Sequence, residues 1–478
     1  MKIQLLLFLM VLSVPLLAQS GIRADKLQED FDFLIQELRR KHQGLYQYED
    51  KETVDKQIDS LRASIDAPMS RLAFYKLVLQ TIGLTNEGHT SADLPKLARF
   101  RLGLSKSFLP LTLKHCDGNY VVTQHFGEEV EGLAKGAKLL AVNGRSMEEI
   151  LPNLYPYIPT DGFNETSRRE WMGSVTFASL YRLVYGKEKR FEVEILESGQ
   201  TKSRTISLPA IRYTSFKTKN AKLPRKSIEH RRFVFRVIED SIAYMSVPSF
   251  GRDGFDYPSF YRSSFRSMDS LGISHLILDL QANGGGTEGN ENLLFSYLTD
   301  QRVQKYREVS MLPGPYEGNK TDEDFIFDKW QSKEGRAVRG EFTLYSDYLS
   351  DLGYEKPAVA DIFHGKLYVL ISGATFSGGA EMSSLVKMTE RGLFIGEETG
   401  GAYEGNVSGY SEEVRLPHSR ILVDIPTVHF QINVRPAVRG RGVMPDKVVA
   451  RYWEDYSMNR NAKLEAALAL IRQGGMMD

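Results

Sequence analysis

The chain has 478 residues, which is too long for one ordinary hydrophobic core and predicts two or three domains. Lys and Arg together number 61, as do Asp and Glu, so the formal net charge is zero. This balance gives no support for nucleic acid or an anionic membrane as a partner. The single cysteine, Cys116, excludes an internal disulfide and a metal site built from several cysteines.

Residues 1–18 have the pattern of a secretory signal peptide. Lys2 precedes an apolar stretch from Leu5 to Leu17, and the small residue Ala18 ends it. The stretch is short for a bilayer span, so we expect a leader, with a membrane anchor as the alternative. The predicted location is periplasmic or extracellular, with membrane contact only through an uncleaved leader.

Residues 22–103 are predicted to form an N-terminal helical domain, because apolar residues recur there at helical spacing. Asp25 and Gln28 resemble a capping box at the start of the first helix. Ser70 is expected to cap a third helix that carries Phe74 and Val78 inward.

Residues 104–212 change to a period of two and predict a small β-rich domain with an insertion. Asp117-Gly118 and Asn143-Gly144 are tight-turn signals, and residues 190–208 predict a further hairpin. A helix is expected around 167–184. Residues 213–235 contain a basic, irregular stretch that we interpret as a solvated linker.

Residues 236–478 alternate strand and helix patterns, which predicts an α/β domain. Continuous apolar strands over 241–247 and 275–280 flank a helical stretch, giving a βαβ unit. Further core strands are predicted over three segments, 366–372, 393–398 and 421–427. An amphipathic helix over 461–475 closes the pattern.

Three consecutive glycines, Gly284 to Gly286, follow the strand over 275–280 at its carboxyl end. In open α/β sheets ligands bind at this edge, and glycines there let backbone N–H groups point into an oxyanion hole. A phosphate-binding loop is the alternative, but no Gly-Lys-Ser/Thr follows the glycines.

A second strand-to-helix turn, "ATFSGGAE", carries Ser377 followed by Gly378. A serine hydroxyl is a poor nucleophile until a base takes its proton. The N–H of Gly378 would lie at a helix N-terminus, which favours a developing oxyanion. We therefore expect Ser377 to be the nucleophile, with Gly378 and either Gly286 or Gly285 as oxyanion donors.

The motifs "DLQANGGG", "ATFSGGAE", "IGEETGG" and "GRGVMPD", in this order, resemble the tail-specific or C-terminal processing serine peptidases. The same broad family includes the tricorn protease core and interphotoreceptor retinoid-binding protein. The resemblance covers most of the chain and implies a ClpP/crotonase-like β-β-α sheet in the catalytic domain and a PDZ-like fold in the β-rich domain. It implies peptide or unfolded-protein substrates, and no metal, nucleotide or other cofactor is needed.

The resemblance offers two kinds of base for Ser377. The tail-specific branch uses a lysine 25 residues after the serine, but here that position is Ala402. Lys387 lies roughly 15 Å further along a helix and cannot replace it. The tricorn-like branch uses a histidine before the PDZ-like region, which corresponds to His89 in "EGHTSAD". Neutral imidazole is an adequate base near pH 7, so His89 is the expected general base, with a structural histidine as the alternative.

The residue that orients His89 is not identified by the sequence. The tricorn-like branch has its acid at the position of Arg439, and a serine at the position of Gly88. Glu381 follows the serine by one helical turn, where a carboxylate would repel an oxyanion, so we expect a structural or capping role for it. The candidates for orienting the base are a backbone carbonyl and three carboxylates, Glu397, Glu398 and Glu404.

Together these features predict a secreted serine endopeptidase that forms an acyl-enzyme on Ser377 with His89 as general base. The PDZ-like domain would present a sheet edge to an extended peptide. Two alternatives are a catalytically silent relative that binds peptides or apolar ligands, and a different acyl hydrolase on the same scaffold. A histidine base predicts that hydrolysis falls as pH drops through roughly 6 to 7.

Overall fold

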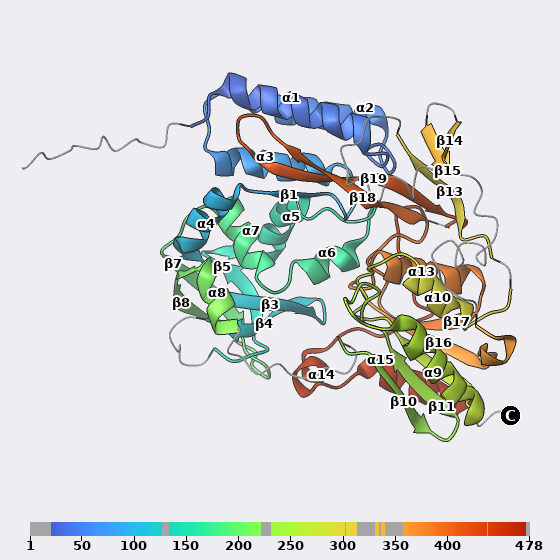
Figure 1. The fold of residues 1–478 in the computed structure, drawn as a ribbon. Helices are drawn as coiled ribbons and strands as arrows, with labels where there is room; N and C mark the ends of the chain where they lie inside the picture. Colours follow the sequence, from blue (N-terminus) through green and yellow to red (C-terminus); the bar gives the residue numbers. More distant parts are fainter. Residues whose placement is uncertain are drawn as a thin grey trace, which may run out of the picture.

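The computed structural model describes residues 21–126, 133–220, 231–301, 303–312, 330–333, 336–339, 357–436 and 438–474. The predicted leader, residues 1–18, lies outside this range. The fold is mixed α/β: helices at the top of Figure 1, a β-rich part at the left and an α/β part at the lower right. Among the described residues, no helix has both the length and the apolar composition that a membrane span requires.

The N-terminal part consists of α1 (Ala24–Lys41), α2 (Lys51–Ala63) and α3 (Arg71–Gly83). Ser70 caps α3 by accepting a hydrogen bond from Ala73 N, as predicted. The predicted capping box on α1 is wrong, because the N-cap residue is Arg23 and makes no side-chain cap. Gln28 Nε2 instead donates to Ile65 O at 2.8 Å, where it holds the chain just after α2.

The β-rich part is an antiparallel sheet with the strand order β3-β4-β5-β7-β8, and β6 pairs with β5. Its strands are β3 (Leu111–Cys116), β4 (Asn119–His125), β5 (Lys138–Val142), β6 (Arg145–Ser146), β7 (Arg190–Leu196) and β8 (Arg204–Pro209). The Asp-Gly and Asn-Gly turns both have positive φ at their two central residues, as the tight hairpin turns require.

Between β6 and β7 the chain forms α5 (Met147–Leu154), η1 (Tyr155–Tyr157), α6 (Glu165–Trp171) and α7 (Thr176–Tyr185). The single helix expected around 167–184 is therefore two helices. Ser174, which has a φ of 57°, separates them, because a left-handed residue cannot continue a right-handed helix.

The predicted linker, residues 213–235, is not irregular throughout, because its first residues, 213–220, form a helix. Residues Ile211–Arg212 form β9, which pairs with β2 (Lys106–Phe108). α8 (Tyr213–Asn220) follows and packs against α4 (Lys96–Leu104). Residues 221–230 lie outside the described part of the chain.

The C-terminal sheet has the strand order β10-β11-β12-β16-β17-β20 and is parallel except for the edge strand β10. The strands are β10 (Val234–Glu239), β11 (Ile242–Ser246), β12 (His275–Asp279), β16 (Lys366–Ile371), β17 (Gly392–Gly396) and β20 (Lys447–Val448). α9 (Tyr257–Ser270), α10 (Asn290–Ser296) and α13 (Gly378–Met388) contribute to the core on one face, and α15 (Ala462–Gly474) covers the other. Two short helices, η3 (Val359–Asp361) and α14 (Trp453–Met458), complete this part.

A further sheet connects the N-terminal helices with the C-terminal part. Its strand order is β1-β19-β13-β15-β14, and β18 pairs with β19. Its strands are β1 (Ser91–Asp93), β13 (Tyr306–Met311), β14 (Trp330–Lys333), β15 (Arg336–Arg339), β18 (Gly405–Arg415) and β19 (Leu422–Ile432). The apolar strand predicted over 421–427 therefore lies mostly in β19 of this sheet and not in the C-terminal sheet.

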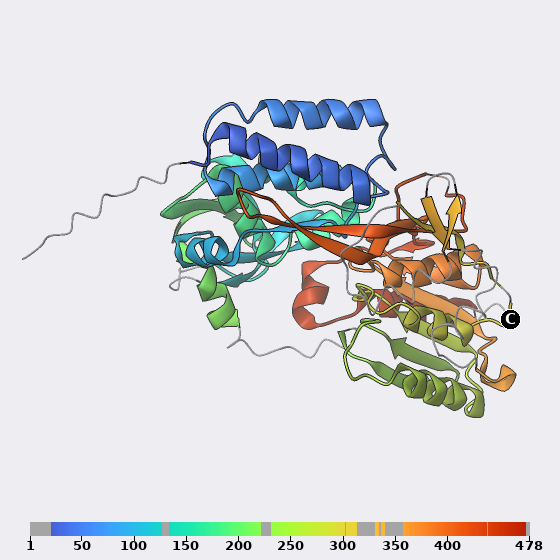
Figure 2. The same cartoon turned by 45° about the horizontal axis from the view of Figure 1, so that its top comes forward.

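The long β18–β19 hairpin runs from the C-terminal part across to α1 and α3 (Figures 1 and 2). At its tip, the buried carboxylate of Asp30 in α1 accepts hydrogen bonds from the N–H groups of His418 and Ser419, each at 2.7 Å. β1 pairs with β19, with Ser91 opposite Asp424. This pairing carries the turn just before β1 into contact with the C-terminal part.

Candidate active site

The two predicted catalytic loops meet at the carboxyl ends of two neighbouring strands in the middle of the C-terminal sheet. β12 and β16 are parallel neighbours, with Asp279 opposite Leu370, so their carboxyl ends lie side by side. Two hydrogen bonds connect the loops that follow: Thr375 Oγ1 donates to Leu280 O at 2.8 Å, and Phe376 N donates to Asn283 O at 2.9 Å. The loops therefore form one rigid unit.

Ser377 is the residue between the second loop and α13, and its backbone is strained. It has φ 51° and ψ −130°, a conformation that non-glycine residues rarely adopt. Such strain persists only where the surrounding structure enforces it, and it is concentrated at functional sites. A sharp strand-to-helix turn of this kind presents a serine hydroxyl at the edge of a sheet.

The first loop lies directly against Ser377. A Cβ atom added at Gly285, which has φ +92°, would lie 2.6 Å from Ser377 Cβ and 2.9 Å from Ser377 Oγ. Any side chain at Gly285 would therefore displace the serine. The N–H of Gly285 donates to Asn283 Oδ1 at 2.8 Å, so it is not free to bind an oxyanion in this arrangement. Gly285 makes room for the nucleophile instead.

The two other predicted donors, Gly378 N and Gly286 N, lie in the same small region. A Cβ atom added at Gly378 would be 3.8 Å from Gly286 N. Within the described part of the chain, neither N–H has an acceptor. Two unpaired N–H groups beside a serine hydroxyl are the arrangement that an oxyanion hole requires.

His89 lies in the turn before β1, and its ring contacts the serine loop. The ring stacks on Phe376, the residue before Ser377, with 4.6 Å between ring centroids and an interplanar angle of 28°. A Cβ atom at Gly88 would be 2.8 Å from Phe376 Cζ, which explains why the chain has glycine here. Trp171 packs edge-on against the same Phe376 ring and fixes its position.

Glu87 orients the His89 ring, and the sequence analysis did not identify it. His89 Nδ1 is 2.8 Å from Glu87 Oε1, which also accepts the N–H of His89 at 3.2 Å. Because a carboxylate only accepts hydrogen bonds, Nδ1 carries the proton and Nε2 keeps its lone pair. Nε2 is buried and has no partner among the described residues, so it is not bonded to Ser377 here. Catalytic hydrogen bonds of this type often tighten only when substrate binds.

Asp161 lies behind Glu87 and forms a carboxyl pair with it. The Glu87 side chain is 1% exposed, and burial raises its pKa to about 7. Burial, together with the charge of Glu87, raises the pKa of Asp161 well above its usual range. Asp161 Oδ1 accepts Gly88 N at 3.0 Å, and Oδ2 accepts Ala402 N at 3.2 Å. With the shared proton on Asp161, the pair presents one negative charge, on Glu87, to the imidazole.

Burial lowers the pKa of His89, while the buried acidic pair that includes Asp161 and the carboxylate of Glu381 act in the opposite direction. The imidazole is therefore neutral near pH 7 and can accept a proton at Nε2. His89 is thus an imidazole that a carboxyl group holds against Phe376, the residue before Ser377.

The three carboxylates that we considered for orienting His89 bind elsewhere, so those candidates are wrong. Glu397 pairs with Lys463, Glu398 pairs with Arg441, and Glu404 accepts the N–H of Gly440. At the position where the tricorn-like branch has its acid, the guanidinium of Arg439 lies 5.9 Å from the centroid of the Tyr48 ring.

Neither of the two positions that the sequence analysis considered for a lysine base, 402 and 387, supplies one. Ala402, at the tail-specific lysine position, is 2% exposed. Lys387 Nζ is 2.6 Å from Asp446 Oδ1. The buried Lys305 is 2.9 Å from Glu291 and 2.7 Å from Glu381.

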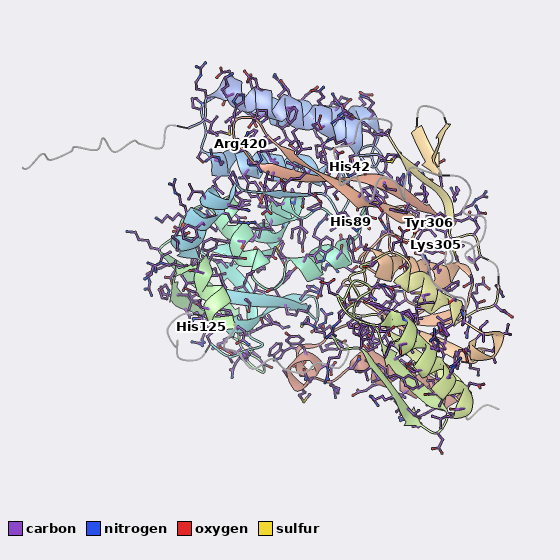
Figure 3. The ribbon with its side chains drawn as sticks, viewed as in Figure 1. His42, His89, His125, Lys305, Tyr306 and Arg420 are labelled. Carbon is purple, nitrogen blue, oxygen red and sulfur yellow. The ribbon has the colours of Figure 1, made fainter. Side chains whose placement is uncertain are left out.

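Although burial acts to lower the pKa of Lys305, its two glutamate partners raise it above its ordinary value, so the amine stays charged. Glu381 also accepts from Tyr306 OH at 2.7 Å and from Asn406 Nδ2 at 3.1 Å, which agrees with the structural role that we expected. Figure 3 shows Lys305 and Tyr306 beside each other, with His89 further along the β18–β19 hairpin.

Glu87, His89 and Asp161 also satisfy the spacing of a metal cluster, since one ligand atom from each lies within 4.8 Å of the others. The carboxylate oxygens already accept hydrogen bonds from four backbone N–H groups and from His89 Nδ1. A metal ion would have to displace these donors. The arrangement therefore fits an orienting network for histidine better than a metal site.

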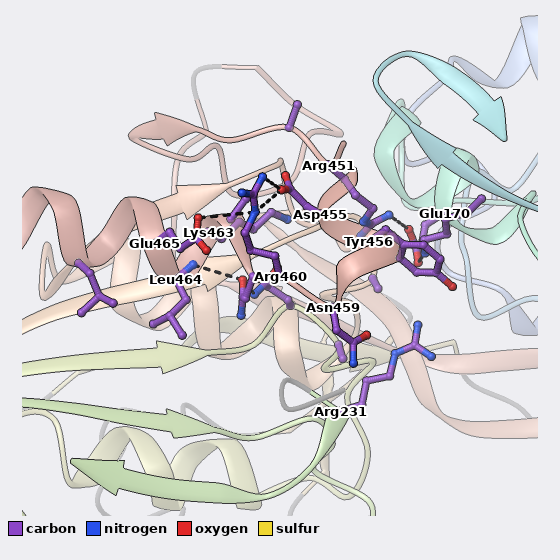
Figure 4. A pocket seen from close by; sticks show the side chains of 18 residues that line it. Glu170, Arg231, Arg451, Asp455, Tyr456, Asn459, Arg460, Lys463, Leu464 and Glu465 are labelled. Atoms are coloured by element: carbon purple, nitrogen blue, oxygen red, sulfur yellow. Dashed lines mark hydrogen bonds and ion pairs between the residues drawn. The ribbon is translucent and has the colours of Figure 1, made fainter. Parts of the chain in front are cut away.

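A cavity of about 360 Å³ borders both catalytic loops through Ala282 and Ala374 (Figure 4). Most of its charged side chains bind one another. Arg451 is 2.8 Å from Glu170 of the β-rich part, which also pairs with Lys114. We assign this network a structural role, because it joins the β-rich part to the C-terminal sheet beneath the catalytic loops.

Residues 241–449 match the model of peptidase family S41. The fold is similar to the crystal structure of mature CPAF, at 15% identity and a TM-score of 0.58, over 91% of this chain and 94% of that one. A CPAF serine-to-alanine mutant gives 15% identity and a TM-score of 0.62, over 91% and 95% of the two chains. The CPAF complex with lactacystin gives 14% and 0.59, over 94% and 97%. No curated protein sequence matches this chain.

Proposed function

We propose that this chain, whose residues 241–449 match peptidase family S41, is a serine endopeptidase that uses Ser377 as nucleophile and His89 as general base. The observation that carries the proposal is the position of His89, which is held by Glu87 and stacked on the residue before Ser377. Its substrates are peptides or unfolded protein tails.

In this mechanism His89 Nε2 takes the proton of Ser377, and the hydroxyl oxygen attacks the scissile carbonyl carbon. The N–H groups of Gly378 and Gly286 stabilise the oxyanion. The imidazolium, which Glu87 stabilises, then gives its proton to the leaving amine. Water attacks the acyl-enzyme with His89 again as base, which restores the free serine.

Export is part of the proposal and depends on the leader-like sequence of residues 1–18. A PDZ-like role for the β-rich domain is also part of it. The sheet of this domain has β3 and β8 at its edges, and an extended peptide can add to a sheet edge through main-chain hydrogen bonds.

The test is hydrolysis of an unstructured peptide library by the wild type and by Ser377→Ala, His89→Ala and Lys387→Ala. We expect loss of cleavage in the first two variants and wild-type activity in Lys387→Ala, the matched control. Full activity of His89→Ala would remove His89 as the base and leave the serine in place. A wild type that leaves every peptide intact but cleaves small esters would indicate another acyl hydrolase, and one that cleaves neither would favour a binding protein.

A further inference from the structure

An exposed apolar stripe runs along α4, on a part of the molecule that the proposed function does not use. Leu97, Phe100 and Leu104 are 60%, 60% and 43% exposed. Their spacing of three and four residues places them on one face of the helix. The buried side of α4 is made instead by Gly103 and the half-buried Ala98 and Leu102. The helix therefore shows its larger apolar side chains to solvent.

Cations surround this stripe. With about 100° of rotation per residue, Lys96 and Arg101 lie on the two sides of the stripe, and both are exposed. Lys106 in β2 lies opposite Arg212 in the neighbouring strand β9, and both side chains are exposed. Residues 94–116 and 198–220 contain neither Asp nor Glu, and the chain brings these two segments together through β2–β9 and α4–α8. Asp93, just before α4, is exposed and pairs with Arg99 of the helix, but the remaining charged residues of these two segments are cations. A chain with zero net charge thus has a basic region around α4.

From these observations we infer that α4 docks the protein on the surface of an anionic lipid bilayer. The exposed face of α4 carries leucine and phenylalanine bordered by Lys and Arg, the side-chain types with which helices bind the membrane interface, while its other side packs on the protein. The stripe would enter the boundary between headgroups and acyl chains, while the flanking cations contact anionic headgroups.

A second copy of this chain fits the surface less well than a bilayer does. A symmetric contact would place the same basic residues of two copies against each other, and like charges across an interface disfavour association. Figure 1 shows α4 at the left side of the molecule and α13, the helix that begins after Ser377, at the right. Docking through α4 therefore leaves the proposed active site open to soluble substrates.

The test places an environment-sensitive NBD fluorophore on α4 in the full chain. The native Cys116 is 1% exposed and is replaced by serine, so Phe100→Cys gives a single labelling site. The matched control is Leu271→Cys, at a leucine that is 57% exposed at the end of α9. The probe reports its own surroundings, so membrane contact through the leader does not produce the signal at position 100. Peptide hydrolysis by the labelled proteins checks that they are folded.

We expect phosphatidylglycerol vesicles to shift the NBD emission at position 100 to the blue and to leave position 271 unchanged. The double variant Lys96→Gln, Arg101→Gln should bind the vesicles about 30-fold more weakly. Each of the two cations near an anionic surface strengthens binding by about fivefold to sixfold. Phosphatidylcholine vesicles should give a weaker response. An unchanged spectrum at position 100, or equal responses at the two positions, would overturn the proposal. A shift that depends on protein concentration without vesicles would also overturn it and assign the surface to a second copy.

Discussion

Replacement of Glu87 by glutamine tests the contact that orients the base. Glutamine keeps the size of the side chain, but an NH₂ group, which donates hydrogen bonds, replaces one of the two carboxylate oxygens. Both oxygens of Glu87 face N–H groups: Oε1 faces His89 N and Nδ1, and Oε2 accepts Val407 N at 2.6 Å. The amide NH₂ of Glu87→Gln must therefore oppose one of these donors, and no negative charge remains to stabilise the imidazolium.

Once His89 has taken the serine proton, it forms a buried charge pair with Glu87, and removing one partner of such a pair costs about 3–5 kcal/mol. Glu87 is 1% exposed and the His89 side chain 19% exposed, so this contact is of the buried kind. Because about 1.4 kcal/mol corresponds to a factor of ten in rate, we expect kcat to fall by about 10²- to 10⁴-fold. The lost charge should also lower the pKa of His89, so the acid limb of the pH profile should move to lower pH.

The assay measures kcat and KM for one peptide across the pH range, for the wild type, Glu87→Gln and Glu404→Gln. Glu404 is the matched control, because it is a partly buried glutamate that accepts from a backbone N–H but does not touch His89. Its replacement should change kcat by less than about tenfold. Equal effects of the two variants, or a Glu87→Gln enzyme with wild-type kcat and an unmoved acid limb, would refute the role of Glu87.

Three further predictions concern the loops, the buried lysine and the pH dependence. Gly285→Ala should abolish measurable cleavage, because the new Cβ would lie 2.6 Å from Ser377 Cβ. Gly284→Ala is the control and should cleave like the wild type, because a Cβ there would have no atom within 4 Å. Peptide-hydrolysis kinetics of both variants test this prediction. Lys305→Met should reduce the free energy of unfolding by about 3–5 kcal/mol in urea titrations, since it leaves Glu381 buried without its cation. Burial raises the pKa of Glu87 to about 7 and lowers that of His89, and protonation of either group should inactivate the enzyme. We therefore expect kcat/KM to fall as pH drops below about 7, whereas a profile that rises only above about pH 8 would indicate an amine base.

Sequence patterns predicted the elements that carry the site, because buried strands and their glycine-rich ends have strong local signals. The strand before Ser377, the helix that begins at Gly378 and the tight turns of the β-rich domain all agree with the structure. The sequence did not distinguish the roles of the three glycines. Gly285 and Gly286 are chemically identical, and only their contacts show that Gly285 makes room for Ser377, while the N–H of Gly286 has no acceptor among the described residues.

Glu87 was missed because local spacing gives no reason to pair it with His89. Side chains two residues apart do not face each other in a helix, and here the contact depends on the turn before β1. Asp161, which pairs with Glu87, comes from a different part of the chain, and its proximity depends on how the domains pack. The strand over 421–427 was predicted, but its sheet was not, since its apolar pattern does not specify that β1 and β13 are its neighbours.

Active-site labelling with a fluorophosphonate, followed by intact-mass measurement, tests the central claim most directly. The probe reacts with a serine hydroxyl only where a base activates it. We predict an adduct on Ser377 in the wild type and in Lys387→Ala, no adduct in Ser377→Ala, and labelling slower by about 10²-fold or more in His89→Ala. An unlabelled wild type, or a His89→Ala chain that labels as fast as the wild type, would contradict the mechanism.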